Sequence, residues 1–311
     1  MNKFSIKDFK GVIPATLTIF DKNEEIDEIE TRKFIRFLLK FNIGGFYLTG
    51  STGEGFLMSL EERKRVVEIV MDEVSGQVPV VVHVGAISTK LSIELAKHAE
   101  KVGATGISSV PPFYWRFTEE QIFNYYKDIA ESTHLPMIVY NVPLVGMMSV
   151  SMIKKLSTIN NVAGVKYTGT TLFECTQIID ACGKDFLVYG GCDEMAASNV
   201  NLGVDGIIVS FYNIVPDLFL DIYNTAKNGE QGKAELLQRN AVRIIMNILS
   251  HNSMTAAMKV CLKHAAICEG YSRKPFNNFM TEQENEIIKS LLNLKKEYNI
   301  ENIELLDRLD K

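Results

Sequence analysis

A single lysine ends an apolar run in the stretch NVAGVKYTG, residues 161–169. Lys166 has two interpretations: a surface charge whose aliphatic stem packs while its ammonium reaches water, or an amine held in a cleft for chemistry. Desolvation favours a neutral amine, which condenses with a ketone to give an iminium. The iminium withdraws electrons, so the neighbouring C–C bond breaks or forms more easily. This chemistry requires no metal, but it requires a proton carrier and a binding site for the carboxylate of a keto acid.

Residues suited to those two tasks lie elsewhere in the sequence. Tyr140, in YNVP, is a candidate proton carrier, although a tyrosine in such a position also packs in many cores with its hydroxyl bonded. Ser51 and Thr52, in GSTGEG, offer hydroxyls and loop amides to an anion, or they only cap a glycine-rich turn. That loop lacks the Gly-Lys-Ser/Thr ending of a phosphate-binding P-loop, so a carboxylate suits it as well as a phosphate does.

Further polar residues follow other apolar runs. Asp193 and Glu194 come shortly after Gly191, and Ser210 stands near the end of a later run. Thr168 stands two residues after the lysine, so the two side chains share one face if this run is a β-strand. Together these residues form a set of acids, hydroxyls and one amine.

Eight short β-rich runs must position these residues. They are GVIPATLTIF (11–20), GGFYLTG (44–50), VPVVVHVG (78–85), GISSVPP (106–112), LPMIVYNVP (135–143), VAGVKYTG (162–169), FLVYGGCD (186–193) and GIIVSF (206–211). Val/Ile-rich runs with little polar alternation are typical of parallel strands that helices cover, and the segments between them carry helical spacing. Eight such units predict a TIM (β/α)₈ barrel, in which catalytic residues lie where the strands end.

The strand signal stops after Phe211, and residues 217–311 carry a helical pattern. One of these helices completes the eighth unit, and the others form a C-terminal extension. We therefore predict a catalytic (β/α)₈ barrel over residues 1–235 and a C-terminal helical region over residues 236–311.

The composition of the chain argues against several functional classes. With a net charge of −5 and no basic patch, it gives no reason to expect nucleic acid as a partner. No apolar run approaches the roughly 18–20 residues that span a bilayer, and we expect no secretory signal at the N-terminus. Five scattered cysteines fit a reducing cytoplasm. The five histidines show no metal-ligand spacing, so we expect a cytoplasmic protein without a metal or a cofactor.

Taken together, these residues resemble the N-acetylneuraminate lyase / dihydrodipicolinate synthase family of pyruvate-dependent class I aldolases. The marks of the resemblance are GSTGE at 50–54, HVG at 83–85, YNVP at 140–143 and GVK at 164–166, and the likeness extends from GVIPATLTIF to RKPF at 273–276. The resemblance implies that Lys166 is the Schiff-base lysine and that Tyr140 mediates proton transfer. It also implies that Ser51 and Thr52 bind the carboxylate of pyruvate, with Ser51 in the proton relay as well.

The resemblance further implies an assembly. Tyr114, in PPFYWRF, matches the tyrosine that members of this family lend across a subunit interface. Such enzymes are commonly homotetramers, so we expect a homotetramer in which Tyr114 belongs to the catalytic set of a neighbouring subunit.

The lyase branch of the family fits the chain better than the synthase branch. The synthase branch carries an arginine shortly after the YNVP-like motif, and YNVPLVGMM has none. The lyase branch is similar in its Gly-x-Asp-Glu, Ser-x-Tyr-Asn and Lys-x-Thr patterns, which here supply Gly191, Asp193, Glu194, Ser210 and Thr168. The resemblance implies that these five residues bind the substrate, and that all of them except Thr168 hold its sugar tail. The chain departs from several lyases in one respect, since no acid follows the threonine and glycine at 168–169.

The expected reaction is cleavage of N-acetylneuraminate to N-acetylmannosamine and pyruvate through a Schiff base on Lys166, with pyruvate and an amino-sugar aldehyde as small-molecule partners. Two alternatives stay open. One is another aldolase of the family, either 4-hydroxy-tetrahydrodipicolinate synthase or an aldolase for a different 2-keto-3-deoxy sugar acid. The other is a non-catalytic sensor of sugar acids, although sensing alone requires neither an amine nor a proton carrier.

Overall fold

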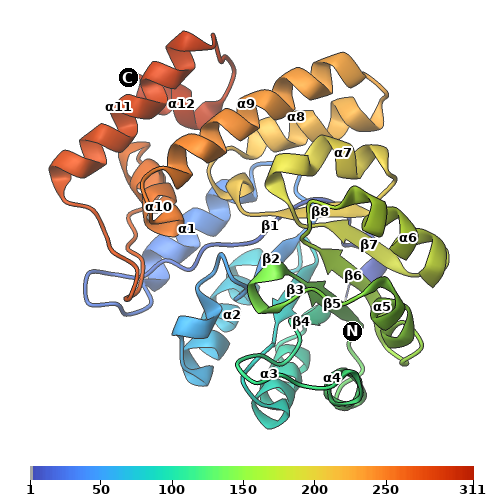
Figure 1. Ribbon diagram of the computed structural model, residues 1–311. Helices are drawn as coiled ribbons and strands as arrows, with labels where there is room; N and C mark the ends of the chain where they lie inside the picture. Colours follow the sequence, from blue (N-terminus) through green and yellow to red (C-terminus); the bar gives the residue numbers. More distant parts are fainter. Residues whose placement is uncertain (1–2) are drawn as a thin grey trace.

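Eight parallel β-strands form a barrel in the computed structural model, which describes residues 3–311 (Figure 1). The strands are β1 (Gly11–Pro14), β2 (Phe46–Leu48), β3 (Val80–His83), β4 (Gly106–Ser109), β5 (Met137–Asn141), β6 (Val162–Tyr167), β7 (Leu187–Gly190) and β8 (Gly206–Val209). Neighbours pair in the order β1-β8-β7-β6-β5-β4-β3-β2, and a parallel bridge between Ala15 and Tyr47 brings the two end strands together. The predicted (β/α)₈ barrel is confirmed.

A helix follows each strand on the outside of the barrel. These helices are α1 (Glu28–Leu38), α2 (Leu60–Val74), α3 (Thr89–Lys101), α4 (Glu119–Glu131), α5 (Val150–Leu156), α6 (Leu172–Cys182), α7 (Ala196–Asn201) and α8 (Pro216–Lys227). Each longer helix buries the apolar residues at helical spacing, such as Phe34, Ile35 and Leu38 of α1. Side-chain caps fix where helices begin, since Ser59 Oγ accepts from the Glu62 amide at the start of α2.

Four further helices follow α8. They are α9 (Gln231–Leu249), α10 (Met254–His264), α11 (Thr281–Glu297) and α12 (Glu304–Leu309). Helix α9 packs against α7 and α8, and α10 and α11 pack in turn on α9, so the orange-to-red helices gather on one side of the barrel (Figure 1). The boundary predicted between residues 235 and 236 falls inside α9, and the division of the chain into two parts stays a prediction. Across residues 3–311, no helix has both the length and the apolar character to cross a membrane.

Alternating side chains on the strands separate an inner core from an outer one. On β5, Ile138 and Tyr140 belong to the inner cluster, whereas Val139 between them packs in the outer layer beneath the helices. Tyr140 is the register partner of Lys166 on β6. The parallel ladder therefore brings this tyrosine and this lysine side by side at the carboxyl ends of neighbouring strands, inside the barrel.

Candidate active site

Lys166 is buried inside the barrel among aromatic rings. The residue is 3% exposed, so its interpretation as a surface charge is wrong. Its Nζ lies 4.2 Å from the centroid of the Tyr140 ring and 4.7 Å from the centroid of the Tyr47 ring. In the part of the chain that the structure describes, Lys166 forms no ion pair, unlike the other deeply buried lysine, Lys259, which does. An amine placed against aromatic faces, with no described carboxylate within ion-pair distance, suits a nucleophile.

Two rings of the inner core pack against Tyr140. Tyr47 meets it edge-on with ring centroids 6.0 Å apart, and the Tyr47 hydroxyl donates to Ser108 Oγ at 2.9 Å. His83 also meets it edge-on, with ring centroids 6.1 Å apart. Burial, helped by the nearby Arg63 guanidinium, holds the pKa of His83 well below its ordinary value, so His83 packs as a neutral ring. The orientation of the Tyr140 ring is therefore fixed by its neighbours, as a proton carrier requires.

Tyr47 is a site residue that the sequence analysis missed. It lies on β2, belongs to the inner cluster and contacts both the amine of Lys166 and the ring of Tyr140. The sequence offered one signal for Tyr47: it is an aromatic residue on the strand that leads directly into GSTGE. GGFYLTG is apolar on both faces, so the sequence does not reveal which of its aromatic residues points inward.

The loop that carries the two predicted carboxylate-binding hydroxyls leaves β2 through a tight turn. Thr49 and Glu54 are in the left-handed region, with φ of 55° and 54°. A Cβ on Gly55 would lie 2.0 Å from the Thr49 carbonyl oxygen, so only glycine fits there. Thr52 is buried, and its hydroxyl shares a hydrogen bond of 2.7 Å with Ser210 Oγ from the loop after β8. The turn thus holds a hydroxyl at the barrel mouth, next to a second one.

The Asp193 carboxylate binds backbone groups of its own chain. Its Oδ1 accepts from the Phe211 amide at 2.7 Å and its Oδ2 from the Ser210 amide at 3.1 Å. Burial raises the pKa of Asp193 to about 6, although these two amide donors and the charge of Lys166 oppose that effect. The carboxylate therefore orients the loop after β8, which presents the Ser210 hydroxyl.

Glu194 and Cys192 lie beside Asp193 with different exposure. Glu194 is exposed, and its Oε2 accepts a hydrogen bond of 3.0 Å from the Cys192 thiol. Burial and the adjacent carboxylate raise the pKa of Cys192 to about 12, so the thiol stays protonated and lines the site without being reactive. Glu194 is thus the exposed carboxylate of the pair, and Asp193 is the buried one.

Thr168 and Gly191 approach each other closely. A Cβ on Gly191 would lie 1.9 Å from Thr168 Oγ1, so the glycine makes room for the hydroxyl. Thr168 Oγ1 is buried and has no hydrogen-bond partner in residues 3–311. A buried hydroxyl without a partner costs about 1–3 kcal/mol, which a polar group of a ligand would recover.

One cavity of about 580 Å³ at the carboxyl ends of the strands collects these side chains. Every predicted site residue except Tyr114 lines it: Ser51, Thr52, Tyr140, Lys166, Thr168, Gly191, Asp193, Glu194 and Ser210. The rest of the wall is Val142, Pro143, Leu144, Gly169, Thr170, Cys192, Met254, Thr255 and Phe276. Tyr114 lies outside this cavity; it is 81% exposed and packs edge-on against Trp115, with ring centroids 5.1 Å apart.

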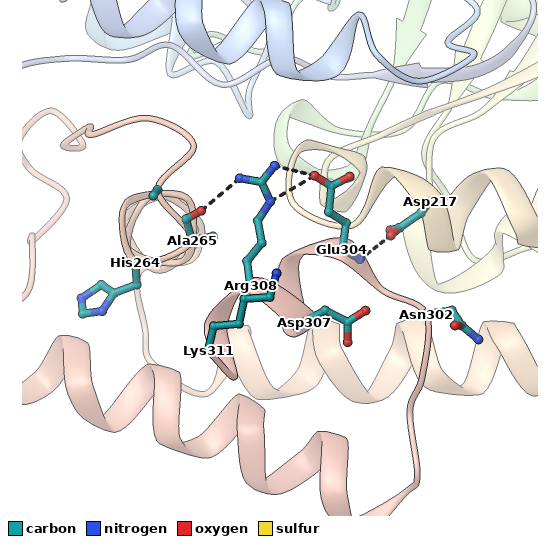
Figure 2. Close-up of a pocket in the computed structure, with 9 residues that line it drawn as sticks. Asp217, His264, Ala265, Asn302, Glu304, Asp307, Arg308 and Lys311 are labelled. Carbon is teal, nitrogen blue, oxygen red and sulfur yellow. Dashed lines mark hydrogen bonds and ion pairs between the residues drawn. The ribbon is translucent and has the colours of Figure 1, made fainter.

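A second cavity lies in the C-terminal helical region, between α8, α10 and α12 (Figure 2). There Arg308 donates to Glu304 at 2.6 and 3.0 Å and to the Ala265 carbonyl at 3.3 Å. The Glu304 amide donates to Asp217 at 2.5 Å. These polar groups bond to one another, and none of the predicted catalytic residues lies among them, so the cavity at the strand ends is the candidate active site. Over residues 3–311, no three His, Cys, Asp or Glu side chains converge on a metal-sized position.

Residues 8–294 match the model of the Dihydrodipicolinate synthetase family. Among curated proteins, the chain is 39% identical over 274 residues to N-acetylneuraminate lyase 2 of Escherichia coli O6:H1, across 87% of this chain and 89% of that protein. It is 36% identical over 275 residues to N-acetylneuraminate lyase of Citrobacter koseri, across 87% of this chain and 92% of that protein.

Solved structures share the fold over almost the whole chain. N-acetylneuraminate lyase from Fusobacterium nucleatum is 33% identical with a TM-score of 0.86, over 94% of this chain and 99% of that one. CdNal from Clostridium difficile, solved in complex with mannosamine, is 30% identical with a TM-score of 0.87, over 93% and 99% of the two chains. A dihydrodipicolinate synthase (dapA) is 31% identical with a TM-score of 0.84, over 94% and 99%.

Proposed function

Because the chain belongs to the dihydrodipicolinate synthetase family and is an N-acetylneuraminate lyase-like aldolase, a carbon–carbon lyase, we propose that it cleaves N-acetylneuraminate through a Schiff base on Lys166. The products are N-acetylmannosamine and pyruvate. The observation that carries this proposal is the position of Lys166. It is a buried amine without an anionic partner in residues 3–311, opposite Tyr140 and in one cavity with Ser51 and Thr52.

The first half of the reaction forms the iminium. Nζ of Lys166 attacks the C2 ketone of the open-chain sugar acid, and the ketone oxygen leaves as water after two proton transfers. The substrate carboxylate lies on the hydroxyls and amides of the loop after β2, near Ser51 and Thr52. This anchor keeps C2 within reach of the amine.

The second half breaks the carbon–carbon bond. Tyr140, helped by the substrate carboxylate and Ser51, takes the proton of the C4 hydroxyl, and the C3–C4 bond then breaks. The aldehyde N-acetylmannosamine leaves, and the electron pair of the broken bond passes into the iminium to give an enamine. Protonation of this enamine at C3 and hydrolysis by water release pyruvate and restore the free amine of Lys166.

Other polar groups of the same cavity would bind the sugar tail. Thr168 offers an unpartnered hydroxyl, Glu194 an exposed carboxylate, and Ser210 a second hydroxyl, and an open-chain sugar acid carries many hydroxyl groups to match them. Gly191 gives close backbone approach, and Asp193 orients the loop that presents Ser210. Among residues 3–311, no arginine and no lysine other than Lys166 lines the cavity to pair with a second substrate carboxylate, which favours the sugar acid over the substrate of the synthase branch.

We also propose a homotetramer in the cytoplasm. Tyr114 supports this assembly, because it is exposed, lies outside the cavity of its own chain and has a left-handed φ of 78°. Its neighbour Trp115 is 68% exposed, and two exposed aromatic rings on one loop are typical of an interface. Light scattering would measure the assembly. A monomer with full activity would contradict a catalytic role for Tyr114 across an interface.

Reduction with borohydride in the presence of pyruvate tests the Schiff base directly. The expected result is a stable adduct on the peptide that contains Lys166, found by mass spectrometry, and no adduct in Lys166→Met. Product analysis then tests the substrate: N-acetylneuraminate is expected to yield N-acetylmannosamine, whereas pyruvate plus aspartate semialdehyde is expected to yield no product. An adduct with the reverse substrate preference would keep the aldolase chemistry and reject the lyase.

A further inference from the structure

A second lysine, far from Lys166 in the sequence, is paired inside the molecule with a residue of the loop after β2. Nζ of Lys259, on α10, lies 2.5 Å from Glu54 Oε1, and the two side chains are 1% and 0% exposed. The other carboxylate oxygen of Glu54 accepts from the Arg273 backbone amide at 2.8 Å. Both oxygens of one buried carboxylate are therefore bound by the C-terminal part of the chain.

A gain in stability is not enough to explain why the chain carries this buried ion pair. Removing two charges from water costs several kcal/mol per ion, and a well-packed apolar pair of the same volume is often at least as stable. Glu54 also has a left-handed φ of 54°, which a non-glycine residue adopts only when its surroundings hold it there. Lys259 and the Arg273 amide supply those surroundings, so the pair fixes a particular backbone conformation.

The conformation that the pair fixes is that of the loop carrying the predicted hydroxyls. The Glu54 amide donates to the Ser51 carbonyl at 3.0 Å and closes the turn that contains Thr52. The Gly53 carbonyl accepts from Thr18 Oγ1 at 2.7 Å, which holds the turn against the chain that follows β1. A shift of the Glu54 side chain would therefore be passed to Ser51 and Thr52 through one tight turn.

The C-terminal segment around this ion pair is itself part of the cavity. Lys259 Nζ also donates to the Tyr271 carbonyl at 2.8 Å. The Arg273 guanidinium donates to Glu62 at 2.6 Å, at the start of the helix that follows the loop. Phe276, three residues later, lines the active-site cavity together with Met254 at the start of α10. The same segment thus holds the loop and supplies part of the cavity wall.

We propose that Glu54, held by Lys259 and by the Arg273 amide, is a positioning residue that sets the Ser51–Thr52 loop for the carboxylate of the keto acid. The C-terminal helical region thereby takes part in binding pyruvate, although neither Glu54 nor Lys259 lines the cavity. This inference rests on the proposed function, because it assumes that pyruvate binds at that loop. Its consequence is specific: disturbing the pair weakens the binding of the keto acid more than that of the aldehyde.

The test measures pyruvate affinity as the pyruvate concentration that gives half-maximal borohydride trapping on Lys166. Glu54→Gln is expected to raise that concentration by about 10-fold to 100-fold, since losing one hydrogen bond to the carboxylate of pyruvate costs about that much. The KM for N-acetylmannosamine in the condensation direction, at saturating pyruvate, is expected to stay within about 2-fold. A loss of folded protein alone would lower the amount of adduct without moving the half-saturation point.

Two further variants separate positioning from stability. Glu54→Gln/Lys259→Met removes both charges at nearly constant volume, leaves no unpaired buried ion and therefore folds even if Glu54→Gln does not. It is expected to bind pyruvate as weakly as the single variant. The matched control is Glu284→Gln. It breaks the pair that Glu284 forms with Lys263, a residue of the same helix as Lys259, α10, away from the loop. This control is expected to lower stability and leave pyruvate affinity unchanged.

The outcomes distinguish this inference from the proposed function. A wild-type protein that forms no adduct on Lys166 would overturn both. An adduct in the wild type, with wild-type pyruvate affinity in the folded double variant, would overturn only the positioning role and leave the ion pair as a stability element. Equal shifts in Glu54→Gln and Glu284→Gln would also overturn it, because the effect would then not depend on the loop.

Discussion

Two lysines are buried in residues 3–311, and the surroundings of their amines differ in one feature. Lys166 and Lys259 are 3% and 1% exposed. The first has its amine against the rings of Tyr140 and Tyr47, and the second has its amine 2.5 Å from the Glu54 carboxylate. Similar burial therefore coexists with different electrostatic environments, one inside the barrel without a directly paired acid and one where the C-terminal helices meet the barrel, with a paired acid.

The contrast shows how one residue type serves two purposes. A buried ammonium needs a counter-charge, and Lys259 has one in Glu54, so its charge is balanced and its position is fixed. A buried amine intended for nucleophilic attack must keep its lone pair accessible, and a carboxylate partner would hold it protonated. The presence or absence of a paired acid, more than burial, separates the structural lysine from the proposed catalytic one.

The strongest way to break this contrast is to remove the proposed nucleophile. Lys166→Met is expected to lower the rate of N-acetylneuraminate cleavage by at least about 10³-fold. The free energy of unfolding is expected to stay constant or rise, because Lys166 leaves no ion-pair partner behind in residues 3–311. Steady-state kinetics and urea unfolding measure the two quantities. Substantial remaining activity would reject the catalytic assignment.

The tyrosines that flank Lys166 give the next largest effect. Tyr140→Phe keeps the ring against the amine but removes the hydroxyl of the proposed proton carrier, and kcat is expected to fall by about 10²–10⁴-fold. Tyr47→Phe keeps the other ring and loses only the hydrogen bond to Ser108, so kcat is expected to fall less than about 10-fold. Similar losses in the two variants would show that the Tyr140 hydroxyl has no special part in the reaction.

The same substitution at the other lysine is expected to act on stability. Lys259→Met leaves the Glu54 carboxylate buried without a cation, and the free energy of unfolding is expected to fall by about 3–5 kcal/mol. Lys263, also on α10, forms a more exposed pair with Glu284 of α11, and Lys263→Met is expected to cost about 1 kcal/mol or less. Urea unfolding measures the free energy of unfolding of both variants. Equal losses would mean that removing the cation from the buried Glu54 pair is no more costly than removing it from the exposed pair.

Two buried carboxylates, like the two lysines, differ in whether they have a charged partner. The effect expected from this difference, on the free energy of unfolding, is the smallest of those predicted. Glu54 has a lysine partner, whereas Asp193 binds amides, and burial raises its pKa from 3.8 to about 6. Between these pH values the folded chain keeps a proton that the unfolded chain has released. The contribution of Asp193 to the free energy of unfolding is therefore greatest below pH 4 and falls, by roughly 1–3 kcal/mol, as the pH rises to about 6.

Urea unfolding of the wild type and Asp193→Asn between pH 4 and pH 7 would measure this contribution. The wild type is expected to lose more stability than the variant over that range, because asparagine does not titrate. Parallel pH curves for the two proteins would mean that the surroundings of Asp193 do not disfavour its charge.

Local sequence patterns were sufficient to predict the barrel and most of the cavity. The eight apolar runs placed Tyr140 and Lys166 near strand ends, and parallel strands bring such ends to one rim. The strands are shorter than the runs: β1 ends at Pro14, although GVIPATLTIF continues to Phe20. The later residues of that run stay buried outside the ladder, so their apolar character does not mark where the strand ends.

Contacts between distant residues were beyond the reach of those patterns. Glu54 and Lys259 are 205 positions apart, and each alone looks like an ordinary charge on a loop or a helix. The binding of sugar by Asp193 stays a prediction, and the Ser210 and Phe211 amides that donate to its carboxylate can be identified only once β7 and β8 are paired. Such partners depend on how helices and loops pack in three dimensions, which the spacing of apolar residues does not specify.

The separation between Glu54 and Lys259 also has a consequence for the order of events during synthesis. The loop that contains Glu54 leaves the ribosome long before α10 does, and N-terminal parts of a chain generally begin to fold first. Until Lys259 emerges, the Glu54 carboxylate must stay hydrated, because burying it alone is too costly. The loop after β2 therefore reaches its final conformation only after α10 has been synthesised, so the proposed keto-acid site is completed late in folding.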